Sequence, residues 1–150
     1  MPIQHNEHHP DIVLYQPDIP GNTGTILRLS ACLGLRLHLI EPAGFRLDDK
    51  SLKRAGMDYV ELAALQKHDN WEAFQDWRKA ENRRLILLTT KADRAYTDFK
   101  YQPGDCLMFG RESAGVPEDV VDAADERLTI PMVDGARSLN VAMSVAMVAG

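Results

Sequence analysis

The sequence predicts a single α/β domain in which a mostly parallel sheet carries helices on both faces. Two observations lead to this prediction. Short apolar runs alternate along the chain with segments of helical periodicity, as expected when helices connect parallel strands. The chain of 150 residues is long enough for one domain with its own core, and 45% hydrophobic with 26% charged residues fits an ordinary globular protein.

The first half of the chain contains two predicted strands, over residues 11–16 (DIVLYQ) and 35–42 (LRLHLIEP). Between them, NTGTILRLSACLG predicts a helix with Asn22 or Thr23 as its N-cap and Gly34 at its C-terminal end.

Two more helices are predicted over residues 47–56 and 70–81. The second of them has three aromatic residues at helical spacing, and we expect this aromatic stripe to pack in the core. The stripe consists of Trp71, Phe74 and Trp77.

The second half repeats the alternation. Strands are predicted over residues 84–89, 105–110 and 127–132, and the composition of the middle one indicates burial on both faces. A short helix is predicted over 116–124, with a proline near its start, and the last helix begins at Ser138. We expect residues 11–150 to form one domain.

No stretch of 18 apolar residues occurs, so we expect no membrane-spanning helix. The N-terminus lacks the pattern of a signal peptide, which favours a cytoplasmic protein. We expect residues 1–10 to form a flexible tail whose histidines bind no metal, because nothing nearby supplies a rigid set of ligands. Two cysteines, Cys32 and Cys106, are expected to be reduced core residues.

The net charge of −5 argues mildly against a nucleic-acid partner, although a local basic patch can outweigh it. In open α/β sheets, ligands bind in the loops at the carboxyl ends of strands. Three of these loops combine glycine with small polar residues, and the last two also contain an arginine: PDIPGNTG, RESAGVP and VDGARSLN. Glycine allows the backbone to approach a ligand closely.

Arg28 is the one charged residue of an otherwise apolar stretch of the first helix. It lies one turn after Gly24, so its side chain can lean back over the GNTG entrance. Either it reaches solvent past apolar neighbours or it serves a site. Glu41, 20 residues after Gly21, stands where a dinucleotide-binding enzyme carries its ribose-binding acid, but GNTG lacks the G-x-G-x-x-G pattern.

Three segments in this order, IPGNTGTILR, LMFGRESAGVP and LTIPMVDGARSLNVAMSVAM, resemble the three sequence motifs of the SpoU branch of SPOUT RNA methyltransferases. The resemblance covers residues 11–150, and it implies that this domain lacks the end of its last helix, because the family continues that helix by several turns. Residues 11–59 are similar to the small single-domain members that methylate the ribose 2′-oxygen of the tRNA wobble nucleotide.

The resemblance implies a C-terminal trefoil knot, which sequence pattern would not suggest because knots are almost absent from proteins. It also implies that the knot binds S-adenosylmethionine, leaving S-adenosylhomocysteine as product. The implied cofactor-binding residues are Leu88, Gly110, Glu112, Ile130, Ser138, Leu139 and Asn140.

The resemblance implies three catalytic residues: Arg28, Asn22 and Ser138. Arg28 either removes the proton of the 2′-hydroxyl, helped by a substrate phosphate, or stays cationic and holds the phosphate and the developing alkoxide. We favour the second role because a guanidinium keeps its charge in proteins. Asn22 is expected to orient Arg28 or the ribose, and it could equally cap the helix.

The implied partners are tRNA and a second copy of the chain, with no membrane and no metal. A basic cluster between the second predicted strand and the aromatic helix is a candidate phosphate track despite the net negative charge. The cluster consists of Arg46, Lys50, Lys53 and Arg54. Two alternatives remain: a non-catalytic RNA-binding homologue, and a Rossmann-like nucleotide-binding enzyme that uses Glu41.

Overall fold

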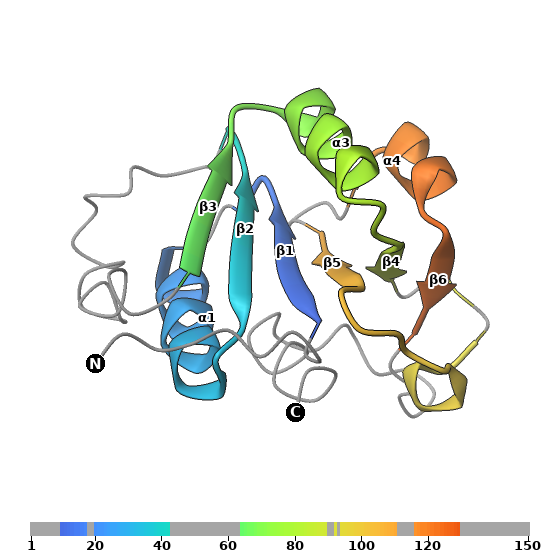
Figure 1. Ribbon diagram of the computed structural model, residues 1–150, viewed down its shortest axis with the longest axis horizontal. Helices are drawn as coiled ribbons and strands as arrows, with labels where there is room; N and C mark the ends of the chain where they lie inside the picture. The colour runs from blue at the N-terminus through green and yellow to red at the C-terminus, as the bar shows by residue number, and fades with distance from the viewer. Residues whose placement is uncertain are drawn as a thin grey trace.

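The computed structural model describes residues 10–17, 20–42, 64–89, 92, 94–110 and 116–129. Within these ranges the chain forms a six-stranded sheet of order β3-β2-β1-β5-β4-β6, and every strand pairing is parallel (Figure 1). The strands are β1 (Asp11–Tyr15), β2 (Arg36–Ile40), β3 (Ala64–His68), β4 (Leu85–Leu88), β5 (Cys106–Phe109) and β6 (Glu126–Leu128). The predicted α/β class is confirmed.

Three α-helices of the described chain cover the two faces of this sheet. They are α1 (Pro20–Leu33), α3 (Trp71–Ala80) and α4 (Glu118–Ala123), and a short 3-10 helix, η2, spans Tyr96–Asp98. On one face, Ile26 and Leu27 of α1 join a core with the even-numbered residues of β1. On the other face, Phe74 of α3 and Val120 of α4 pack against the odd-numbered ones. Helices therefore lie on both faces, as predicted.

The helix ends follow from local sequence. The structure starts α1 at Pro20, so the prediction of Asn22 or Thr23 as N-cap is wrong. Proline suits a first helical turn, because its φ is already helical and the N–H it lacks would have no partner there. At the other end, Gly34 has a φ of +70° and ends α1 as predicted.

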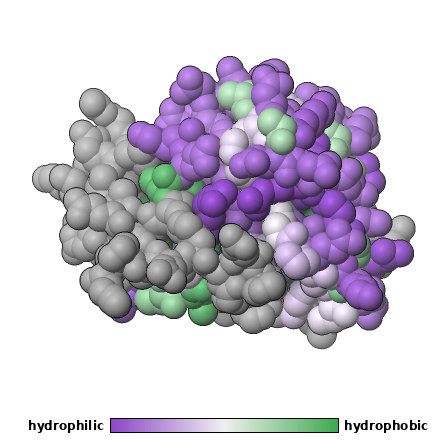
Figure 2. Space-filling model, viewed as in Figure 1, coloured by the Kyte–Doolittle hydropathy of each residue, from purple (hydrophilic) through white to green (hydrophobic). Residues whose placement is uncertain are grey.

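The aromatic stripe of α3 packs in the core, as predicted. Phe74 is fully buried, and Trp71 and Trp77 pack partly buried against the same cluster. Asn70 caps the helix, since its side chain accepts a hydrogen bond of 2.8 Å from the backbone N–H of Ala73. Hydrophilic residues dominate the outer surface over α3 and α4 (Figure 2).

The structure adds one strand that was not predicted and corrects one further prediction. Strand β3 was not predicted, because ALQKH is a polar edge segment that pairs only with β2. Cys106 is buried as expected, but Cys32 is an exposed free thiol rather than a core residue. Cys32 shares its exposure with Thr25 and Arg28, which stand at helical spacing on α1, away from Ile26 and Leu27.

The remaining predictions about the fold concern residues that the structure does not describe. These are the helix over 47–56, the last helix, the knot and most of the N-terminal tail. None of the helices in the described ranges is long and apolar enough to cross a membrane.

A buried polar chain connects β1, β2 and β3. The Nε2 atom of His38 lies 2.8 Å from Oδ2 of Asp11, and Nδ1 of His38 lies 3.0 Å from Nε2 of His68. A carboxylate only accepts hydrogen bonds, so His38 donates from Nε2 and its Nδ1 accepts from His68. All three residues are buried, and both imidazoles pack on Trp77 and Phe74.

The surroundings of His38 and His68 favour the neutral form of both imidazoles. Burial, with a smaller contribution from the nearby His38, lowers the pKa of His68 from 6.5 to about 4. Burial also lowers the pKa of His38, although Asp11 opposes that shift. As the pH falls below 6.5, these histidines therefore become protonated more readily in the unfolded chain than in the folded protein.

We predict that the protein loses stability as the pH falls from 6.5 towards 4. Between pH 7 and pH 5, His68 alone removes about 2 kcal/mol from the free energy of unfolding. The measurement is urea denaturation across this pH range for the native sequence, for His68→Gln and for the exposed neighbour variant Lys67→Gln. His68→Gln is expected to reduce the pH dependence and Lys67→Gln to leave it unchanged. Equal pH dependence in both variants would contradict the prediction.

Candidate active site

The carboxyl ends of four strands lie in one row. Leu14 of β1 pairs with Phe109 of β5, Phe109 with Leu88 of β4, and Leu88 with Leu128 of β6. Because the strands are parallel and in register, the loops that follow them open along one edge of the sheet. These are the loops that the sequence singled out as candidate ligand sites, together with the one after β4.

The centre of this edge is a topological switch point. From β1 the chain proceeds outward through β2 to β3, and then returns to β4 and β5 on the other side of β1. Helix α1, which follows β1, packs on one face of the sheet, and α4, which follows β5, packs on the other; ligands of open α/β sheets bind at such a switch point. In the described chain, α1 begins at Pro20 and Gly110 directly follows β5.

The structure brings Leu88 and Gly110 to this edge. Leu88 is the last residue of β4 and is buried, whereas Gly110 directly follows β5 and is half-buried. Ile130 lies just outside the described residues, after Thr129. Three strand ends that sequence reasoning grouped by composition and resemblance are thus neighbours in the sheet.

A set of backbone hydrogen bonds fixes the loop after β4 to the end of β6. The Thr129 N–H donates to the Arg94 carbonyl at 2.8 Å, and the Tyr96 N–H donates to the Thr129 carbonyl at 2.8 Å. The Thr89 N–H donates to the Leu128 carbonyl at 2.9 Å. Sequence reasoning missed this pairing, because no residue pattern indicates which loop a short strand end will meet.

Arg28 lies on the exposed side of α1, one turn after Gly24. Side chains on a helix tend to lean back towards its N-terminus, which for Arg28 is the end of α1 that follows β1. Asn22 lies in the first turn of the same helix, and its side chain is outside the described part of the structure.

The other predicted site residues fall on segments that the structure does not describe. These are Glu112, Ile130, Ser138, Leu139 and Asn140 of the predicted cofactor site, and Arg46, Lys50, Lys53 and Arg54 of the basic cluster. Their roles stay predictions. The same holds for the three histidines of the N-terminal tail.

Glu41 lies beyond the end of β2, on the side of the sheet away from β5. Its backbone N–H donates to the carbonyl of His68 at 2.9 Å, which extends the pairing of β2 with β3. The observed contact of Glu41 is therefore with the outer edge strand.

The SpoU rRNA Methylase family matches residues 10–150. The chain is 52% identical to a tRNA (cytidine(34)-2′-O)-methyltransferase of Ancylobacter novellus over 93% of its own length and 88% of that protein. It is 50% identical to an Escherichia coli protein of the same name, over 92% and 88% of the two chains.

The fold is also similar to a solved structure described as "Structural insights into the 2-OH methylation of C/U34 on tRNA". The TM-score is 0.90 at 40% sequence identity, covering 96% of this chain and 93% of the other. The sequence similarity and the fold similarity thus both extend over more than nine-tenths of the chain.

We predict that replacing Arg28 changes stability little, since its side chain is exposed on α1. Arg28→Ala should change the free energy of unfolding by no more than about 1 kcal/mol, the upper range for an exposed ionic contact. Leu27→Ala, at the fully buried neighbouring position, should cost about 2–5 kcal/mol. Urea denaturation of both variants measures the difference. A comparable loss in both would show that Arg28 supports the fold.

Proposed function

The chain belongs to the SpoU methylase family, and from this premise we propose that it methylates the ribose 2′-hydroxyl of cytidine or uridine at position 34 of tRNA. The similarity to tRNA (cytidine(34)-2′-O)-methyltransferases over nine-tenths of the chain carries this proposal. Family membership also excludes the alternative of a Rossmann-like enzyme that uses Glu41. The substrate favours a cytoplasmic enzyme.

The proposed methyl donor is S-adenosylmethionine, which when bound supplies an electrophilic methyl group. The sheet edge formed by the carboxyl ends of β5, β4 and β6 suits the adenine and ribose of this cofactor. The strand ends Phe109, Leu88 and Leu128 are apolar and buried, so the backbone groups of the following loops are the natural polar partners for adenine and ribose. Gly110 leaves room above β5, because it has no side chain.

The residues proposed to bind the cofactor are Leu88, Gly110 and Ile130 through their backbone, Ser138, Leu139 and Asn140 at the start of the last helix, and Glu112 near the positive charge. This arrangement needs no acidic ribose-binding residue, which accounts for the position of Glu41 beside the outer edge strand.

Arg28 is proposed to hold the substrate phosphate and to stabilise negative charge on the 2′-oxygen as its proton leaves. A guanidinium presents several donors in a fixed plane and keeps its charge. Stabilising a developing oxyanion in this way lowers the barrier, and aligning the oxygen with the methyl group lowers it further. Asn22 and Ser138 are proposed to orient Arg28 and the ribose.

We predict that Arg28 is required for methylation. Native protein, S-adenosylmethionine and transcribed tRNA should yield 2′-O-methylated nucleoside at position 34, detected by mass spectrometry. Arg28→Ala should reduce turnover about 100-fold or more, the usual effect of removing an oxyanion-stabilising donor. Lys79→Ala, an exposed change on α3 across the sheet from α1, is the control and should leave turnover unchanged.

Arg28→Lys separates the two roles considered for Arg28. The planar guanidinium is lost while the charge remains, so turnover should stay well below the native rate. Near-normal turnover would contradict positioning by a guanidinium. Absence of product from the native protein would instead favour a non-catalytic RNA-binding homologue.

The basic cluster is proposed to bind tRNA phosphates. We predict that the triple change of Lys50, Lys53 and Arg54 to Gln weakens tRNA binding and lowers the salt dependence of log Kd by about three charges. Fluorescence anisotropy at several salt concentrations measures both quantities. Unchanged affinity and an unchanged salt slope would remove the proposed phosphate track.

The active form is proposed to be a homodimer. Light scattering of the purified protein measures its mass directly, and a monomeric mass at assay concentration would contradict this proposal.

A further inference from the structure

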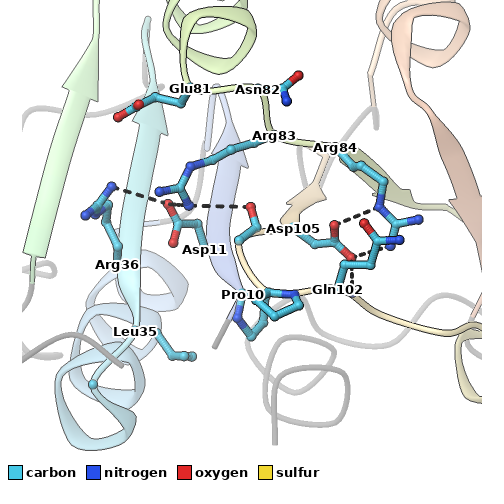
Figure 3. A pocket seen from close by; sticks show the side chains of 13 residues that line it. Pro10, Asp11, Leu35, Arg36, Glu81, Asn82, Arg83, Arg84, Gln102 and Asp105 are labelled. Carbon is cyan, nitrogen blue, oxygen red and sulfur yellow. Dashed lines mark hydrogen bonds and ion pairs between the residues drawn. The ribbon is translucent and has the colours of Figure 1, made fainter. Parts of the chain in front are cut away.

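A pocket of about 400 Å³ opens at the amino ends of the strands, opposite the edge that carries the proposed methylation site. It is formed by the start of β1 and by the turns that lead into β2, β4 and β5 (Figure 3). Arginines come from two of these turns: Arg36 from the first, and Arg83 and Arg84 from the second.

Each of the three turns is fixed by a residue with a positive φ: Gly34 at +70°, Asn82 at +56° and Gly104 at +85°. After α1, the Leu35 N–H donates to the Ser30 carbonyl at 2.9 Å. After α3, the corresponding bond joins the Arg83 N–H to the Arg78 carbonyl at 3.1 Å. This is the Schellman arrangement, and it satisfies carbonyls that a helix end would leave unpaired.

The third turn is a four-residue β-turn from Gln102 to Asp105. The Asp105 N–H donates to the Gln102 carbonyl at 3.2 Å, and proline followed by a positive-φ glycine is typical of type II turns. Backbone hydrogen bonds thus stabilise all three turns around the pocket, and the arginines follow two of these turns directly.

The two carboxylates in the pocket wall are buried and already bonded. The side chain of Asp105 is 2% exposed, and it accepts from Arg84 at 2.8 and 2.7 Å and from the Gln102 N–H at 2.8 Å. The side chain of Asp11 is 8% exposed; it accepts from His38 and lies 3.2 Å from Arg83. These carboxylates present little free surface to the pocket.

The guanidinium groups are more exposed than the carboxylates. The side chains of Arg36, Arg83 and Arg84 are 29%, 23% and 31% exposed. Within the described residues, Arg36 approaches the Asp11 carboxylate to 3.8 Å, which is too long for a hydrogen bond. Arg36 and Arg83 converge on the Asp11 carboxylate (Figure 3).

Charge accounting supports an anion at this place. Arg84 is neutralised by Asp105, but Arg36 and Arg83 share the single charge of Asp11. Glu81 is a third carboxylate of the lining, and because it is exposed, solvent screens its charge. Guanidinium donors held in place by buried acceptors suit a tetrahedral oxyanion.

We propose that this pocket binds a phosphate group between Arg36 and Arg83. The phosphate comes either from a small phosphorylated molecule or from the backbone of RNA, and the experiment below separates these sources. The proposal goes beyond methyl transfer and does not depend on it, because the pocket lies at the opposite edge of the sheet.

The experiment is a titration of the full chain with inorganic phosphate at constant ionic strength, followed by two-dimensional amide NMR. Saturable shifts are expected at the amides of Gly34, Asn82 and Gly104. In Arg36→Gln the phosphate affinity should be about tenfold weaker, the usual loss with a charge-assisted hydrogen bond. Lys67→Gln removes the same charge from an exposed site on β3 and should bind phosphate normally.

Absent or non-saturable shifts in the native protein would overturn the proposal, whether or not any variant folds. Equal affinity in Arg36→Gln and the native protein would also overturn it. A titration with tRNA then identifies the source. If RNA supplies the phosphate, Arg36→Gln weakens tRNA binding and lowers its salt slope by about one. If a small molecule supplies it, tRNA binding is unchanged while phosphate binding is lost.

Discussion

The parallel direction of all six strands is the constraint on which the rest of the structure depends. Parallel strands can be joined only by crossovers, so every strand begins at one edge of the sheet and ends at the other. The loops after β5, β4 and β6 therefore open side by side, and the turns before β2, β4 and β5 meet at the opposite edge. One register thus creates both the proposed cofactor site and the arginine pocket.

Much of the fold could be predicted from the sequence, because its central strands are short apolar runs buried on both faces. Residues 85–88 and 106–109 are buried at every position, and such runs between helical segments are characteristic of parallel sheets. Strand β3 escaped prediction because only pairing with β2 makes ALQKH a strand. Its His68 is buried by contacts with Phe74 and Trp77, which sequence pattern does not reveal.

For the candidate site too, the sequence predicts some positions and not others. The positions of Leu88 and Gly110 could be predicted, because each follows directly from where an apolar strand ends. The exposure of Arg28 and the wrong assignment of Cys32 share a cause: both residues lie on the outward side of an unusually apolar helix, whose inward side already holds Ile26 and Leu27. Composition shows that a helix is apolar but not which side faces the sheet.

The pocket lined by Arg36 and Arg83 could not be predicted, because these arginines and Asp11 lie at or near the starts of three different strands and meet only when the sheet forms. Its distance from the proposed methylation site limits what it can do. Strands of four or five residues span about 15 Å, several times the reach of a hydrogen bond. A phosphate between Arg36 and Arg83 could therefore contribute to binding but could not touch the transferred methyl group. Replacing Arg36 or Arg83 should therefore affect binding, whereas replacing Arg28, which is proposed to act on the reacting oxygen itself, should affect turnover.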